Sequence, residues 1–141
     1  MATIMQVPDS HRDLLDDPIC AILTTISPSG QPQNTVIWCS YDGEHVLVNT
    51  ADGRAKPRNV RNNPNVALMV VDPTNVMRWI DVRGTVERID HDHDCAHIDM
   101  LNFQYTGRDS GFFGTAAPLA EKATQKRLIF RIKPENIVTL G

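Results

Sequence analysis

The sequence has few cysteines and no long apolar run, and both absences narrow the class of protein. Its three cysteines, Cys20, Cys39 and Cys95, stand far apart and form no CxxC pair. An odd number of separated cysteines indicates reduced thiols, so we expect a cytoplasmic protein. The longest apolar run, residues 66–71, is far shorter than the roughly 18 residues that a membrane-spanning helix needs. We therefore expect no membrane segment, and the N-terminal residues show no signal-peptide pattern.

Several motifs that mark common enzyme and nucleotide-binding classes are also missing. The chain contains no GxGxxG or Walker pattern, which disfavours Rossmann-type and nucleotide triphosphatase functions. No GxSxG elbow surrounds Ser29 or Ser110. With 14 basic and 17 acidic residues the net charge is −3, whereas nucleic-acid-binding proteins are usually basic. We therefore expect no nucleic-acid partner.

Two histidines have the spacing of a metal site. His93 and His97 lie one helical turn apart, with Cys95 between them. The glutamate of an HExxH motif is missing, however, and the neighbouring residues are acidic and polar, as on an exposed helix. We interpret the pair as part of such a helix and predict no metal.

The distribution of apolar residues predicts a single domain over residues 1–141, with six strands. The predicted strands cover residues 20–27, 33–41, 45–50, 65–72, 79–89 and 126–133, and a short segment at 137–140 finishes the chain. Helices are predicted at 9–17, over a basic stretch that ends near Asn62, and at 90–106, where acidic residues suit a helix start. Residues 107–118 are expected to form a loop.

The order of these elements predicts a mainly β fold, a six-stranded antiparallel split β-barrel with two or three short helices. Turn residues at 27–32 and at Asp42-Gly43 join the first three strands as hairpins. Gly84 lies in the middle of the fifth predicted strand. A glycine at such a position indicates a bulge or a bend.

The basic stretch NTADGRAKPRNVRNNP, residues 49–64, is the most informative part of the chain. Four cations, Arg54, Lys56, Arg58 and Arg61, follow Gly53 within eight positions. A helix start already carries a partial positive charge, so cations gathered there are unfavourable without an anion. A phosphate group would suit the site. The alternative from charge alone is a solvated basic helix face.

The order of elements and four motifs resemble the flavin-binding split-barrel superfamily, typified by pyridoxamine 5′-phosphate oxidase. The motifs are ISPSGQPQNTVIW, VNTADGRAKPRNVRNNPNVALMVVD, RWIDVRGTVE and RLIFRIKPENI. The chain is most similar to small members described as probable coenzyme F420-dependent oxidoreductases. The resemblance implies a homodimer, with the cofactor in a cleft between the subunits.

The resemblance also implies a set of cofactor-binding residues. Thr50, Arg54, Lys56, Arg58 and Asn59 match positions that hold the cofactor phosphate. Val36, Trp38, Val48 and Asn49 match positions beside the tricyclic ring, and Arg78 and Trp79 match positions on a strand that reaches the cofactor. Trp79 replaces a glutamine of the oxidase. The oxidase's C-terminal tryptophan and basic substrate motif have no counterpart, so we do not expect oxidation of pyridoxamine phosphate.

The expected cofactor is the deazaflavin F420, with flavin mononucleotide (FMN) as the alternative. Both carry a flat tricycle and a ribityl phosphate, so the phosphate anchor does not separate them. The expected reaction is hydride transfer to a small unsaturated or planar substrate, with the reactivity supplied by the cofactor. No catalytic residue is assigned. A carrier that holds the cofactor or a tetrapyrrole without turnover is the remaining alternative.

Overall fold

The computed structural model describes residues 5–141, in which seven strands form one antiparallel sheet. The strands are β1 (Ala21–Ile26), β2 (Pro32–Ile37), β3 (Cys39–Tyr41), β4 (Val46–Ala51), β5 (Asn65–Val71), β6 (Trp79–His91) and β7 (Arg127–Leu140). Their order across the sheet is β2-β1-β5-β6-β7-β4-β3. The mainly β, antiparallel, split-barrel architecture is thus confirmed.

The predicted number of strands is wrong, and the sheet is not closed, because the expected strand 33–41 breaks at Trp38. Before the break, Ile37 of β2 pairs with Ala21 of β1, and after it Cys39 of β3 pairs with Val48 of β4. Strands β2 and β3 therefore form the two edges of the sheet, which stays open between them.

The break has a physical cause in the side chains that surround it. Trp38 leaves the strand direction and stacks on Tyr105, with ring centroids 5.1 Å apart and planes 14° from parallel. The Tyr105 hydroxyl accepts a hydrogen bond from the Cys39 amide (3.1 Å) and lies 2.9 Å from the carbonyl oxygen of Ile19. The backbone around position 38 is thereby bonded to a side chain rather than to a neighbouring strand.

The helices are shorter than expected. They are η1 (Asp9–His11), α1 (Asp13–Asp16), α2 (Ala55–Asn62), η2 (His93–Cys95), α3 (Ala96–Thr106) and η3 (Leu119–Ala123). Residues 90 and 91 continue β6, so the prediction of a helix from residue 90 is wrong at its start. Asp94 and Cys95 have φ angles of 57° and 58°, a left-handed turn that separates β6 from α3.

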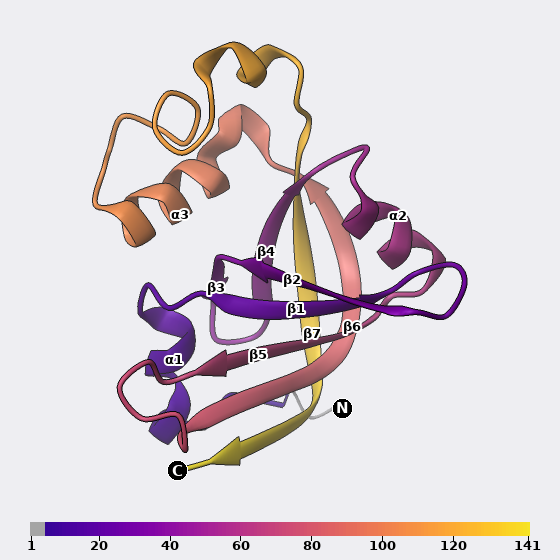
Figure 1. The fold of residues 1–141 in the computed structure, drawn as a ribbon, viewed down its shortest axis with the longest axis vertical. Coiled ribbons are helices and arrows are strands. Elements are labelled where there is room, and N and C mark those ends of the chain that lie inside the picture. The colour runs from indigo at the N-terminus through magenta and orange to yellow at the C-terminus, as the bar shows by residue number, and fades with distance from the viewer. Residues whose placement is uncertain (1–4) are drawn as a thin grey trace.

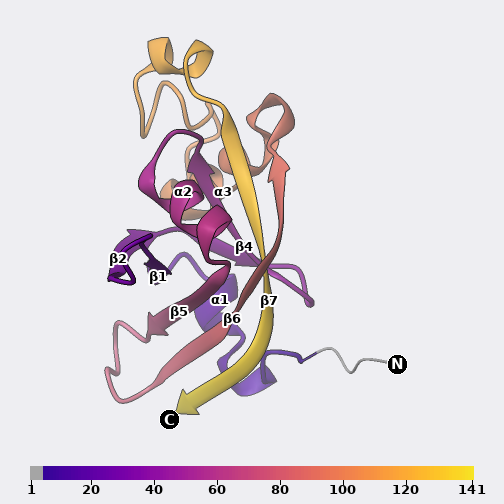
Figure 2. The ribbon, with the colours of Figure 1, turned by 90° about the vertical axis from the view of Figure 1, so that its right-hand side faces the viewer.

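The barrel core and the helical layer form two apolar clusters. Leu23, Leu68, Val82, Phe130 and other strand residues fill the barrel, and Leu14 and Leu15 of α1 join them. The second cluster joins α3 to the loop that follows this helix. It contains Cys95, Ile98, Leu101 and Phe113, with Trp38, Tyr105, Phe112 and Ala117 packed against it. Figures 1 and 2 show that α3 and this loop lie beyond one end of the barrel, whereas α2 lies at the side of the barrel.

The bulge predicted at Gly84 is confirmed. The register between β6 and β7 shifts between Arg83 and Gly84, where Gly84 pairs with Pro134. A Cβ atom on Gly84 would lie 1.9 Å from the carbonyl oxygen of Lys133, so this position excludes every side chain. Within residues 5–141, no helix has the length and apolar character needed to cross a membrane.

Candidate functional site

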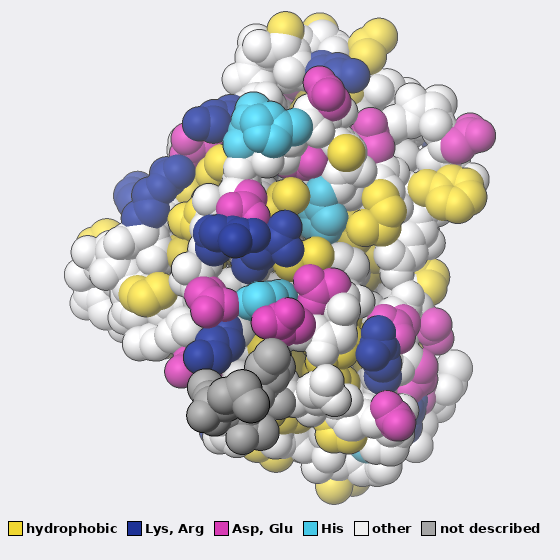
Figure 3. Space-filling view, turned by 180° about the vertical axis from the view of Figure 1, so that it is seen from behind, with side chains coloured by type: hydrophobic (Ala, Val, Ile, Leu, Met, Phe, Trp, Pro, Cys, Tyr) yellow, Lys and Arg dark blue, Asp and Glu magenta, His cyan; other side chains and the backbone are white. Residues whose placement is uncertain are grey.

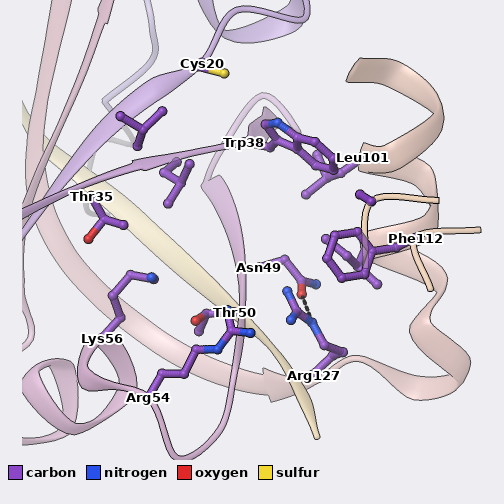
Figure 4. Close-up of a pocket in the computed structure, with 14 residues that line it drawn as sticks. Cys20, Thr35, Trp38, Asn49, Thr50, Arg54, Lys56, Leu101, Phe112 and Arg127 are labelled. Carbon is purple, nitrogen blue, oxygen red and sulfur yellow. Dashed lines mark hydrogen bonds between the residues drawn. The ribbon is translucent and has the colours of Figure 1, made fainter. Parts of the chain in front are cut away.

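A cavity of about 390 Å³ lies where the sheet is open, between the barrel and the helical layer. Its size falls in the range of small-molecule sites. The residues that line it are Cys20, Thr35, Val36, Ile37, Trp38, Asn49, Thr50, Arg54, Lys56, Ile98, Leu101, Phe112, Ala116 and Arg127. Figure 4 shows Lys56 and Arg54 on the side of α2, with Leu101 and Phe112 on the side of α3. The cavity therefore has a cationic end and an apolar, aromatic end.

Three cations share the cavity without an acidic partner. Arg54, Lys56 and Arg127 line it, and none of them forms an ion pair within residues 5–141. Elsewhere several cations are paired with acids, as Arg131 is with Asp90, and the molecule seen from behind carries interleaved acidic, basic and histidine side chains (Figure 3). Unpaired cations that line one cavity indicate an anionic ligand.

The pKa values of two of these cations reflect their crowding. Burial lowers the pKa of Lys56, and the neighbouring charges of Arg54 and Arg127 lower it further. Burial also lowers the pKa of Arg127, with a further contribution from Arg54. The guanidinium nevertheless stays charged at neutral pH. An anion between these side chains would relieve both the desolvation and the repulsion.

A buried hydroxyl group at the same end lacks a partner. Thr50 is 1% exposed, and its Oγ1 forms no hydrogen bond within residues 5–141. Buried polar atoms are nearly always hydrogen-bonded, so an unpaired one beside a cavity indicates a missing ligand or ordered water. The hydroxyl and the cations of Arg54 and Lys56 together offer the donors that a phosphate group needs.

The local fold explains why these residues meet. Thr50 is near the end of β4, Arg54 immediately precedes α2, and Lys56 lies in the first turn of that helix. No side chain caps the start of α2, and its first turn contains no acid. Free N–H groups of the helix start add to the positive character of this end of the cavity.

Asn49 connects the cavity to a buried polar network. Its Oδ1 accepts a hydrogen bond from Nε of Arg127 (2.9 Å), and its Nδ2 donates to Oδ2 of Asp92 (2.9 Å) and to Nδ1 of His97 (2.9 Å). Arg127 also donates from Nη1 to Gln125 (2.9 Å). Its Nη2 group forms no hydrogen bond within residues 5–141 and remains available to a ligand.

The apolar wall is aromatic. The rings of Trp38 and Phe112 meet edge to face, with centroids 6.1 Å apart. The guanidinium of Arg127 lies 5.0 Å from the centroid of the Phe112 ring. A planar ligand with an anionic group would find a flat apolar surface at one end and cations at the other.

Six of the sequence-predicted residues line this cavity, and five do not. Those that line it are Val36, Trp38, Asn49, Thr50, Arg54 and Lys56. Val48 is fully buried in the barrel core, and Arg58 is exposed on α2. Asn59 is fully buried and donates from Nδ2 to Thr25 (3.0 Å) and Gln33 (2.8 Å), which ties α2 to the β1–β2 hairpin.

Arg78 and Trp79 lie elsewhere in the chain's own fold. Arg78 forms ion pairs with Asp13 and Asp72 (3.0 Å to the latter) and donates to the Ser10 carbonyl. These carboxylates hold the Arg78 pKa above its usual value. Arg78 lowers the pKa of Asp13, whereas hydrogen bonds from Thr74, with a smaller contribution from Arg78, lower the pKa of Asp72. Trp79 is half-buried at the start of β6. Contact of Arg78, Trp79, Val48, Arg58 or Asn59 with a cofactor stays a prediction.

The sequence did not identify Arg127 as a cavity residue, and it did not indicate that His97 is buried. Arg127 reaches the cavity because β7 pairs with β4, which places Arg127 opposite Ala51. His97 is 9% exposed, so its interpretation as part of an exposed helix is wrong, whereas His93 is exposed and lies against His91. Within residues 5–141, no three side chains of His, Cys, Asp or Glu gather as a metal ion would require.

The fold and the site together define the class of protein. An open antiparallel barrel with a cationic pocket at the end of β4, walled by aromatic rings, is that of a flavin-binding split-barrel protein. Residues 7–141 match the family model named pyridoxamine 5′-phosphate oxidase. The chain belongs to this family. No curated protein shows significant sequence similarity to it.

Solved structures agree with this assignment. A protein named F420 reductase is 36% identical, with 94% of this chain and 98% of that chain covered and a TM-score of 0.81. A conserved hypothetical protein from Mycobacterium tuberculosis is 20% identical (99% of this chain, 88% of the other, TM-score 0.69). The haem storage protein HutZ from Vibrio cholerae is 16% identical (97% and 96%, TM-score 0.64). The last two similarities concern the fold alone.

Proposed function

We propose that the protein is an oxidoreductase that uses the deazaflavin coenzyme F420 to reduce a small, planar, unsaturated substrate. The observation that carries the proposal is the orphaned Thr50 hydroxyl beside the unpaired cations Arg54 and Lys56, at the end of a cavity with an aromatic wall. This arrangement fits a ribityl phosphate and a flat ring. The F420 reductase that is 36% identical over nearly the whole chain favours the deazaflavin over FMN.

In this proposal each part of the cavity has a distinct task. Arg54, Lys56 and the Thr50 hydroxyl bind the phosphate, with help from the N–H groups that begin α2. Val36 and Trp38 contact the ring. When bound, the deazaflavin supplies a hydride to the electron-poor double bond of the substrate.

The protein's own residues position the reactants and exclude water. Ile98, Leu101 and Phe112 make the far wall apolar, which strengthens the electrostatic interactions inside. Among the described residues that line the cavity there is no carboxylic acid, imidazole or phenol. Cys20 and Lys56 carry titratable protons at the cavity, so the proton that completes the reduction can come from solvent or from one of these two side chains.

The test is a titration of the purified protein with F420 and, separately, with FMN, followed by fluorescence. We expect saturable binding, tighter for F420. Lys56→Ala should weaken binding by about 1.5–3 kcal/mol, the range for a hydrogen bond to a charged group. Lys133→Ala, which removes an exposed lysine of β7, should leave the affinity unchanged. Absence of binding of both cofactors would contradict the proposal, and tighter binding of FMN would favour the flavin alternative.

A carrier role for a tetrapyrrole is the second candidate, because HutZ shares the fold. Haem iron is usually held by His, Cys, Met or Tyr. Of these types, the described residues that line the cavity include Cys20 alone. Steady-state oxidation of reduced F420 with quinones, nitro compounds and tetrapyrroles separates the two roles. Turnover with any acceptor excludes a pure carrier.

We also propose that the protein is a homodimer with the cofactor at the subunit interface. Val36 lies on the edge strand β2, lines the cavity and is 67% exposed. A second copy placed against this edge would cover it and complete the cavity. Size-exclusion chromatography with light scattering tests the proposal, and a monomer at micromolar concentration would contradict it.

A further inference from the structure

The buried polar network behind Arg127 is more elaborate than a simple anion site requires. Asp92 is 3% exposed, and its carboxylate accepts hydrogen bonds from the backbone amides of His97 (2.8 Å) and Ile98 (3.0 Å). The left-handed residues Asp94 and Cys95 turn the chain so that Asp92 reaches the start of α3. Non-glycine residues rarely adopt this conformation, and two in succession indicate a constrained connection. The connection brings His97 against Asn49.

The orientation of the Asn49 amide is fixed by its other partners. Nε of Arg127 is always a donor, so it requires the Asn49 oxygen. Oδ2 of Asp92 already accepts a hydrogen bond from the Ile98 amide, so it is an acceptor here and requires the Asn49 nitrogen. The second hydrogen of that nitrogen points to Nδ1 of His97, which must accept it. His97 is therefore neutral, with its proton on Nε2, 3.4 Å from the Ser40 hydroxyl.

We propose that neutral His97 is a positioning residue of the cavity, which orients the guanidinium of Arg127 through Asn49 so that the free Nη2 group faces an anion. The proposal rests on the proposed function only in requiring that an anion occupies the cavity. His97 does not line the cavity, and it acts through a chain of two hydrogen bonds.

Protonation of His97 would break this chain. A proton on Nδ1 would face the N–H of Asn49, so the amide would have to turn away. Nε of Arg127 would then lose its acceptor, and the guanidinium would lose its orientation. We therefore expect the affinity for an anion to fall in acid. Direct electrostatics predicts the opposite sign, because an imidazolium near the cavity would attract an anion.

The surroundings of His97 set the pH at which this occurs. Burial lowers the His97 pKa, and the charges of Arg131 and Arg127 on β7 lower it further, whereas Asp92 raises it. Ser40 of β3 and Asn49 of β4 complete the surroundings and are uncharged. The net shift is downward from 6.5, so the loss of affinity should lie on the acidic side of that value.

The experiment measures the affinity for inorganic sulfate, whose charge does not change between about pH 5 and 8, the range in which histidine titrates. For the wild type we expect a loss of about five- to tenfold on acidification across this range. His97→Asn places an oxygen near Nδ1 that can accept from Asn49 and does not titrate, so its affinity should be nearly independent of pH. His97→Phe lacks the acceptor and should bind sulfate more weakly throughout the range.

His93→Asn is the matched control, because His93 is an exposed histidine in the same segment. It should keep the pH profile of the wild type. A wild-type affinity that rises in acid, or a His97→Asn profile that follows the wild type, would overturn the proposal.

A second measurement keeps the inference independent of ligand binding and of the folding of the variants. In ¹⁵N NMR spectra of the wild type, Nδ1 of His97 should be unprotonated at neutral pH. The side-chain resonances of Arg127 Nε–H and Asn49 Nδ2 should shift together as His97 titrates. If sulfate does not bind at all, the anion site of the proposed function is refuted. These resonances still test whether His97 orients Arg127 through Asn49. A constant Arg127 resonance through the His97 titration refutes it.

Discussion

Replacement of Thr50 by valine tests whether one hydroxyl group destabilises the ligand-free protein and strengthens anion binding. Valine has nearly the same shape as threonine and suits a β-strand equally well, so β4 should retain its packing. The substitution removes a hydroxyl that is buried, with Thr50 only 1% exposed, and that has no partner within residues 5–141. We expect Thr50→Val to stabilise the ligand-free protein and to weaken anion binding.

The magnitude follows from the price of an unpaired polar group. A buried hydroxyl without a hydrogen bond costs about 1–3 kcal/mol in proteins. We expect a value near the lower end of this range, because the cavity is open to water near the cations. The free energy of unfolding should therefore rise by about 1–1.5 kcal/mol. With a urea dependence of about 2 kcal/mol per molar, the midpoint of unfolding should increase by roughly 0.5–0.8 M. Sulfate affinity should fall by about 1 kcal/mol, the contribution of one hydrogen bond.

Thr25→Val is the matched control with the opposite sign. Thr25 is also 1% exposed, but its hydroxyl accepts a hydrogen bond from Nδ2 of Asn59 at 3.0 Å. Its removal should lower the free energy of unfolding by about 1–2 kcal/mol, because one buried donor loses a partner. Urea denaturation of both variants, followed by circular dichroism, provides the comparison. If Thr50→Val is destabilised as much as Thr25→Val, the hydroxyl of Thr50 has a partner in solution and the reasoning fails.

Three further predictions concern the alkaline limit of binding, the bulge and the sheet opening. Sulfate affinity should decrease as the pH rises through the Lys56 pKa, because only the protonated amine binds the anion. Burial lowers that pKa from 10.5, so the decrease should begin at a lower pH than for a free lysine. The Lys56→Arg variant should lose less affinity over the same pH range, as measured by titration calorimetry. Gly84→Ala should lower the free energy of unfolding by the upper part of the about 1–3 kcal/mol range for overpacking, because its Cβ would lie 1.9 Å from the Lys133 carbonyl oxygen. Thermal unfolding measures this loss, and a change below about 1 kcal/mol would mean that the bulge relaxes. Tyr105→Phe keeps the ring but leaves the Cys39 amide without its hydrogen-bond partner. The free energy of unfolding in urea should therefore fall by about 1–3 kcal/mol. An unchanged unfolding midpoint would argue against the hydrogen bond between Tyr105 and Cys39.

Local patterns in the sequence predicted those features that depend on neighbouring residues. The bulge at Gly84 and the hairpin that joins β1 to β2 both follow from residues close together in the chain. The meeting of Thr50, Arg54 and Lys56 in one cavity is local in the same sense, because one strand end and one helix start bring them together.

The parts that sequence reasoning missed depend on distant pairing. Arg127 approaches Asn49 across 78 positions in sequence, because the register of β4 and β7 sets their separation. A one-residue change in that register would turn Arg127 to the other face of the sheet. The burial of His97 likewise depends on the turn before α3, where acidic residues at 90–94 favoured an exposed helix. No local signal distinguishes the buried Asp92 from its exposed neighbour Asp94.

The break at Trp38, which the sequence did not predict, opens the sheet beside the cavity that the proposed function requires. A continuous strand over residues 33–41 would have joined the two edges of the sheet and let it close, because β2 and β3 would then be one strand. Instead β2 and β3 separate, and Trp38 turns onto Tyr105 beside the cavity. The cationic end of the cavity lies next to this opening, so an anion bound by Lys56 can carry a planar group that reaches the aromatic wall. A sheet that closed at this point would still hold the cations, but it would have nowhere to place a ring.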